Sequence, residues 1–186
     1  MILAPTILAA TRRQRAMLQF LLIDGAIFLI LFLTYLYLRL RAPDWAGALH
    51  FASAVMALAM TLFAFAGSFT MAAARNAQSK HDNFLAARLL SATVGLWVMF
   101  LICDGMEWGR LLFFEKPPII FAQTFCLITG YHALHLIAGL PYLFMVAVHI
   151  DRSDAGAAAL LVHFTNAIWL LIFIAIYMFG TDLQGF

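Results

Sequence analysis

Five long apolar runs dominate this sequence of 186 residues, and they constrain the fold more than any other feature. A helix needs about 20 mostly apolar residues to cross a hydrocarbon core about 30 Å thick. Backbone groups inside lipid must be hydrogen-bonded within the chain, so each run is predicted to be a helix. The expected spans cover residues 17–40, 49–74, 85–114, 119–150 and 156–181.

The composition argues against a soluble domain beside these spans. Hydrophobic residues make up 65% of the chain and charged residues 11%, with a mean hydropathy of +0.96. Soluble domains are about 45–50% apolar and about 25% charged. We therefore expect residues 1–186 to form a single membrane domain, an all-α integral membrane bundle of five transmembrane helices. The short links predict that neighbouring spans pack antiparallel.

Basic residues in the links predict the orientation of the bundle, because they gather on the cytoplasmic side. Seven lie at the N-terminus and in the second and fourth links: Arg12, Arg13, Arg15, Arg75, Lys80, Arg88 and Arg152. Four lie in the first and third links: Arg39, Arg41, Arg110 and Lys116. The N-terminus is therefore expected to be cytoplasmic and the C-terminus outside. The net charge of +2 is small and spread over the links, which gives no indication of nucleic-acid binding.

The stretch TRRQR before the first span superficially resembles a twin-arginine signal. The apolar run behind it is longer than a signal h-region, and no clear small-residue cleavage site follows. We therefore expect a first span that is retained. Cys103 and Cys126 both fall inside predicted spans, where isolated thiols are typically inert. A disulfide between them is the less favoured alternative, because it needs close, well-aligned Cβ atoms.

A short set of polar residues interrupts the apolar runs. Ionisable groups in lipid are costly, and they tend to face the bundle interior or a polar partner. The set consists of Asp24, Asp104, Glu107, His132, His135, His163 and the uncharged Asn166.

Two pairs in this set suggest a metal site as one interpretation. Asp104 and Glu107, like His132 and His135, are spaced i, i+3, which places each pair on one helix face. Carboxylates and imidazoles that project between facing helices build the metal sites of bundles. The favoured alternative is that these groups hydrogen-bond to each other and to the backbone, and so hold helices together.

Asp24 also has two interpretations. It could relay protons, or it could be an acid that fixes one helix to another. An unpaired carboxylate in a low-dielectric setting tends to protonate. Since Asp24 and His163 both lie about two turns from the same end of their spans, pairing with His163 or with a neighbouring subunit is the favoured interpretation. No nucleophile elbow, phosphate loop or dinucleotide fingerprint occurs, and no paired histidines on several helices suit bis-imidazole haem ligation.

Four segments resemble subunit III of the haem-copper oxidases, in the same order along the chain. TGYHALHLIAG at 129–139 resembles the signature TGFHGLHVxxG. LLIDGAIFLILFLTYLY at 21–37 resembles the family's span with an acidic residue before an aromatic-rich run. MEWGRLL from Met106 resembles its glutamate–aromatic pair at a span end. VHFTNAIWLLIFIAIYMFG at 162–180 resembles the closing WHFVDxVWLxL segment.

The resemblance implies roles for most of the intramembrane polar residues. Asp24 takes the place of the family's intramembrane carboxylate, and Glu107 that of its span-end glutamate. His132 and His135 match the two signature histidines, and His163 matches the histidine of the closing motif. Five spans match the shorter bacterial form, as in ubiquinol oxidases, which implies the bacterial inner membrane.

The family further implies a subunit without redox centres and without catalysis of its own. Such a subunit packs beside catalytic subunit I and the other subunits of an oxidoreductase complex, which hold the haem and copper. It binds phospholipid between its helices, stabilises the core and supports sustained proton uptake. On this view the two signature histidines tie their helix to its neighbours.

Three departures keep alternatives open. Val162 replaces the family's tryptophan, Asn166 its aspartate, and Ala133 the glycine of the signature. These substitutions indicate a divergent branch, and a subunit III-like accessory protein of a nitric oxide reductase is one alternative. A membrane metalloenzyme using Asp104, Glu107, His132 and His135 is an alternative of another class. A small transporter or channel is less favoured, because the second span carries almost no ionisable residues.

Overall fold

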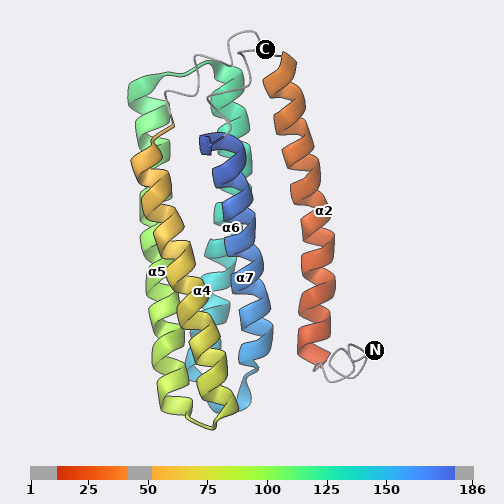
Figure 1. The fold of residues 1–186 in the computed structure, drawn as a ribbon, viewed down its shortest axis with the longest axis vertical. Helices are drawn as coiled ribbons and strands as arrows, with labels where there is room; N and C mark the ends of the chain where they lie inside the picture. Colours follow the sequence, from red (N-terminus) through yellow and green to blue (C-terminus); the bar gives the residue numbers. More distant parts are fainter. Residues whose placement is uncertain (1–11, 42–51, 179–186) are drawn as a thin grey trace.

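The computed structural model describes residues 12–41 and 52–178, and these residues are almost entirely helical (Figure 1). All five long helices are long and apolar enough to cross a membrane. The elements are α2 Arg12–Arg41, α4 Ala54–Ser79, α5 Asn83–Gly109 with the π-helical turn η2 Arg110–Glu115, α6 Ile119–Val148 with the 3-10 turn η3 Ile150–Arg152, and α7 Ala155–Ile172 with the π-helical turn η4 Phe173–Met178. The predicted all-α fold with five spans is confirmed.

The second span is displaced along the chain from its predicted range of 49–74. Helix α4 begins at Ala54, because the side chain of Ser53 caps it by accepting a hydrogen bond from the Met56 N–H. It continues to Ser79 through polar residues that a hydropathy pattern does not count as part of a span. Residues 49–51 and 179–181 of the predicted spans lie outside the described residues.

Successive helices alternate in direction, so the ends of the bundle differ. The start of α2, the turn between α4 and α5, and the link between α6 and α7 lie at one end, as the figure shows (Figure 1). We call this the arginine-rich end; its basic residues are Arg12, Arg13, Arg15, Arg75, Lys80, Arg88 and Arg152. The turn between α4 and α5 passes through His81, whose φ is 62°. That the arginine-rich end faces the cytoplasm stays a prediction.

Small residues let α4 lie close to α5 and α7. Ala57, Ala64, Gly67 and Ala74 are buried along one stripe of α4, at the spacing of a single helix face. Helices α4 and α5 run side by side (Figure 1) and pack along their lengths. Because α7 contacts α2, α4 and α6, half of its apolar segment is buried.

Helix α2 lies at the edge of the bundle, against α7 and α6 (Figure 1). Phe28 and Tyr35 are buried, whereas most of the large apolar side chains of α2 are exposed. The Tyr35 hydroxyl donates to the Ala175 carbonyl at 3.0 Å, and the Arg39 guanidinium donates to the same oxygen at 3.4 Å. These bonds attach α2 to the end of α7, while its outer face stays apolar, as a lipid-facing surface requires.

Candidate functional site

Three side chains, Asp24, Tyr131 and His135, join α2 to α6; Asp24 is buried, and Tyr131 and His135 are half-buried. Asp24 on α2 is 3% exposed. Its Oδ1 atom accepts a hydrogen bond from the Tyr131 hydroxyl at 2.6 Å and lies 3.0 Å from His135 Nε2. Phe28 packs against both aromatic partners, with ring centroids 4.9 Å from Tyr131 and 5.4 Å from His135. The intramembrane acid of the first span is therefore paired within the chain.

The protonation of His135 follows from its neighbours. Its Nδ1 atom lies 2.8 Å from the Tyr131 carbonyl, which can only accept, so Nδ1 carries a hydrogen. Its Nε2 atom must then either donate to an ionised Asp24 or accept from a protonated one. In either state, the Asp24–His135 contact joins α2 to α6 beside a groove that His135 lines.

The predicted pairing of Asp24 with His163 was wrong, whereas pairing with a neighbouring subunit stays a prediction. His163 on α7 is exposed, and the contacts that Asp24 makes in the described chain go to Tyr131 and His135. Similar depth in two spans did not bring Asp24 and His163 together, because Asp24 faces α6 whereas His163 is exposed. Tyr131 lies four residues before His135, so helical spacing could have identified it as a third member.

His132 makes a separate connection, from α6 to α7. It is buried, and its Nε2 atom lies 3.1 Å from the Thr165 carbonyl, which fixes the hydrogen on Nε2. The ring also packs against Phe100 and Trp169, with centroids 5.4 Å and 5.7 Å away. The two signature histidines thus bond to two different helices, His132 to α7 and His135 to α2.

Asn166 connects α7 to α4. Its amide nitrogen donates to the Ala64 carbonyl and to the Ser68 hydroxyl, each at 2.8 Å. One turn further along α7, the Trp169 indole donates to Thr61 at 3.0 Å. Because hydrogen bonds between helices stabilise membrane bundles, the asparagine at this position has a structural role in this chain.

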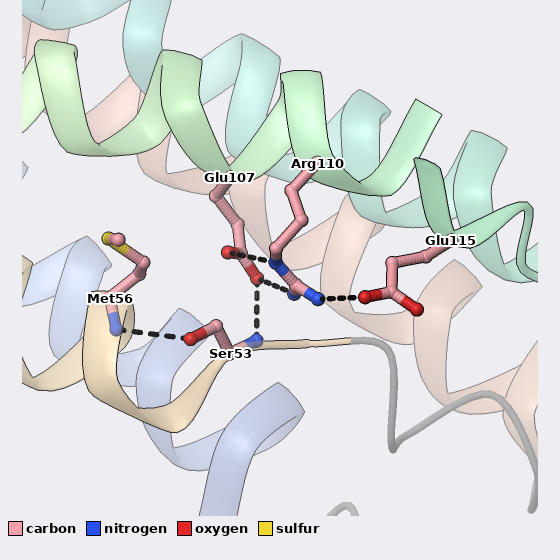
Figure 2. Close-up of polar contacts among 5 residues, drawn as sticks. All are labelled: Ser53, Met56, Glu107, Arg110 and Glu115. Atoms are coloured by element: carbon pink, nitrogen blue, oxygen red, sulfur yellow. Dashed lines mark hydrogen bonds and ion pairs between the residues drawn. The ribbon is translucent and has the colours of Figure 1, made fainter. Parts of the chain in front are cut away.

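Glu107 holds the end of α5 to the start of α4 (Figure 2). Its carboxylate is fully buried. It accepts two bonds from the Arg110 guanidinium, at 2.9 and 3.3 Å, and one from the Ser53 N–H at 2.6 Å. Arg110 also reaches Glu115 at 3.2 Å. The sequence singled out Glu107 but missed Arg110, although the i, i+3 spacing of the two residues indicates such a pair.

The four residues of the metalloenzyme alternative do not converge on one point. Glu107 is engaged by Arg110 and Ser53, His132 by α7 and His135 by Asp24. Across residues 12–41 and 52–178, no three side chains among His, Cys, Asp and Glu lie close enough to hold a metal ion. Cys103 and Cys126 are free and half-buried.

A groove runs from the trio to the arginine-rich end. It has a volume of about 650 Å³ and lies between α2, α6 and α7. His135 lines its inner part and Arg13 lies at its other end, with apolar Met17, Phe20 and Leu161 between them. Beside Arg13 is a shallow polar hollow, which is lined by Arg12, Arg13, Gln78, Arg152, Ser153 and Asp154. The apolar groove thus ends beside a polar hollow that contains three arginines, Arg12, Arg13 and Arg152.

Comparison with known proteins gives a consistent result. The sequence model of the family described as cytochrome c oxidase subunit III matches residues 13–181. Cytochrome c oxidase subunit 3 of Synechocystis is 27% identical over 177 residues, which cover 89% of this chain and 75% of the relative. The subunit 3 of Corynebacterium diphtheriae is 27% identical over 144 residues, covering 72% and 70%. That of Glycine max is 33% identical over 103 residues, covering 51% and 38%.

The family match includes all five helices described here, as well as Asp24, Glu107, His132, His135, His163 and Asn166. The fold has the five spans that the resemblance implied. This chain therefore belongs to the cytochrome c oxidase subunit III family.

Proposed function

We propose that this chain is the non-catalytic subunit III of a respiratory haem-copper terminal oxidase in a bacterial inner membrane. The family match over residues 13–181 carries the proposal. Catalytic subunit I and its companions would supply the haem and copper. His132, His135 and Glu107 are engaged in bonds that connect different helices, which supports a stabilising role.

The proposal is tested by comparing the complex with and without this chain. Removing the chain should leave the initial turnover of the core largely intact and shorten the time for which turnover is sustained. Re-adding the purified chain should restore the original time course. Complete loss of initial turnover would contradict an accessory role. The substitutions at Ala133, Val162 and Asn166 keep a nitric oxide reductase as the alternative core.

We propose that the Asp24–His135 pair supports sustained proton uptake. Asp24→Ala should retain initial turnover but speed the loss of activity during turnover, because it leaves His135 without its carboxylate. Thr34→Ala is the matched control, since Thr34 lies on the same helix, is exposed and bonds only to the Ile30 carbonyl of its own helix. Oxygen uptake followed over time measures both quantities. An unchanged decay rate in Asp24→Ala would contradict this role.

We propose that the groove between α2, α6 and α7 binds a phospholipid. Arg12, Arg13 and Arg152 would contact the phosphate, and the acyl chain would lie along the apolar lining. The double variant Arg12→Gln/Arg13→Gln should retain lipid about 30-fold more weakly, since each basic residue contributes about 1 kcal/mol. Native mass spectrometry measures this, with Lys80→Gln/Arg88→Gln as a control at the same end. Equal lipid retention in both doubles would contradict the assignment.

A further inference from the structure

Asp104 differs from the other buried carboxylates discussed above. It lies on α5 and is 3% exposed, and its Oδ1 atom has no hydrogen-bond partner in the described chain. Asp24 Oδ2 also lacks a partner, but Asp24 Oδ1 and both oxygens of Glu107 are bonded within the chain, whereas Asp104 has no hydrogen bond of this kind among the described residues. A buried polar group without a partner is costly. Asp104 Oδ1 itself has almost no exposed surface, so a partner from outside this chain would reach the carboxyl group through the groove that Asp104 lines.

Asp104 lines an open groove between α5 and α6. The groove has a volume of about 570 Å³, and its small residues are Gly105, Gly130 and Ala133. Trp108 bounds it and is held in place, since its indole donates to Thr129 at 2.9 Å. Gly130 packs against the Trp108 ring and Ala133 is buried, whereas a Cβ atom at Gly105 would meet nothing within 4 Å. The groove is therefore open beside Asp104, where a small residue allows another helix to approach closely and a polar side chain can be bonded across the interface.

The depth of Asp104 indicates what kind of molecule supplies the bond. Asp104 lies 11 residues before Glu115, the last residue of η2. The span Asn83–Glu115 has 33 residues, so at about 1.5 Å per residue Asp104 lies about 8 Å beyond its midpoint, which is still inside a hydrocarbon core about 30 Å thick. Lipid headgroups lie at the membrane surface, whereas the side chain of a transmembrane helix can place a donor at this depth.

We infer that the α5–α6 groove receives a transmembrane helix of another subunit, with a hydrogen-bond donor inside the hydrocarbon core that bonds to Asp104. The inference rests on the proposed function, because a multi-subunit oxidase supplies such a helix. Suitable donors are the hydroxyl of Ser, Thr or Tyr and the amino group of Lys. The groove adjoins the lipid groove between α2, α6 and α7, and Leu134 lines both.

Photocrosslinking in the intact complex tests this inference. A benzophenone amino acid replaces Ile137, which lines the groove and is 54% exposed. It should crosslink to a transmembrane segment of a co-purifying chain, identified by mass spectrometry. Asp104→Asn, which keeps an acceptor oxygen, should preserve the crosslink. Asp104→Leu should reduce its yield about 3- to 20-fold, the range expected for one hydrogen bond within a membrane.

The possible outcomes separate the inference from the proposed function. A crosslink to lipid alone or to a second copy of this chain overturns the inference, as does an undiminished crosslink in Asp104→Leu. If Asp104→Leu does not fold, the crosslinked product in the wild-type and Asp104→Asn complexes decides the question. The haem spectrum of the same sample reports on the proposed function. If the sample shows haem bands but the groove gives no crosslink to another subunit, only the inference is overturned. If no oxidase core co-purifies, the proposed function is overturned.

Discussion

Glu107→Gln is expected to lower the free energy of unfolding by about 3 kcal/mol, because breaking a buried ion pair on one side costs about 3–5 kcal/mol. The wild-type carboxylate is fully buried and accepts three bonds, two from Arg110 and one from Ser53 (Figure 2). The neutral amide offers one acceptor oxygen and turns its NH2 group toward donors. The start of α4 should be the part of the structure most weakened, since Ser53 caps that helix and its N–H bonds to Glu107.

Glu115→Gln is the matched control, because Glu115 pairs with the same arginine in an exposed setting. Its side chain is 42% exposed, and the contact with Arg110 is 3.2 Å long. Exposed ion pairs contribute about 0–1 kcal/mol, so this variant should stay within that range. Unfolding in mixed detergent micelles, followed by circular dichroism, measures both variants. Equal stability losses would show that the burial of Glu107 has no special importance.

Gly139→Ala is expected to destabilise the bundle by about 2 kcal/mol. A Cβ atom at this position on α6 would lie 2.6 Å from one carbon of the Trp97 ring and 3.2 Å from another. Trp97 is a rigid, buried core residue, so either the ring or the helix must move. Overpacking costs about 1–3 kcal/mol, and a contact as short as 2.6 Å places this variant at the upper end of that range. The gain of about 1 kcal/mol in helix propensity then leaves a net loss of about 2 kcal/mol.

Gly95→Ala provides the comparison for Gly139→Ala. Gly95 lies on α5, and a Cβ atom there would meet nothing within 4 Å. This variant should be neutral or more stable by up to about 1 kcal/mol, since alanine is the better helix former. The same unfolding measurement applies. If both glycine variants gained stability, the prediction that a Cβ atom at position 139 clashes with Trp97 would be wrong.

Hydropathy predicted the fold well, because apolar length decides which segments cross a membrane. It placed α4 five residues too early, since Ser53 and the polar residues after Ala74 set that helix's ends and a hydropathy pattern does not register caps. The tertiary connections were harder to predict. The sequence identified Asp24 and His135 as intramembrane polar residues, but their pairing depends on how α2 rotates against α6.

The same limit applies to the motif residues. The i, i+3 spacing of His132 and His135 correctly predicted neighbouring positions on α6, yet the rings bond to different helices. Asp104 and Glu107 share a spacing as well, but Glu107 is enclosed by α4 while Asp104 lies at a groove. Spacing along one helix places side chains on a face, whereas the identity of the partner depends on the packing of the whole bundle.

The central claim is that this chain is a subunit of a haem-copper oxidase, and purification from native membranes tests it most directly. The chain is isolated in mild detergent, the co-purifying proteins are identified by mass spectrometry, and the visible spectrum of the sample is recorded. We predict haem bands together with a terminal oxidase core. A nitric oxide reductase core would select the alternative complex. A colourless chain that co-purifies with no haem protein would contradict the account.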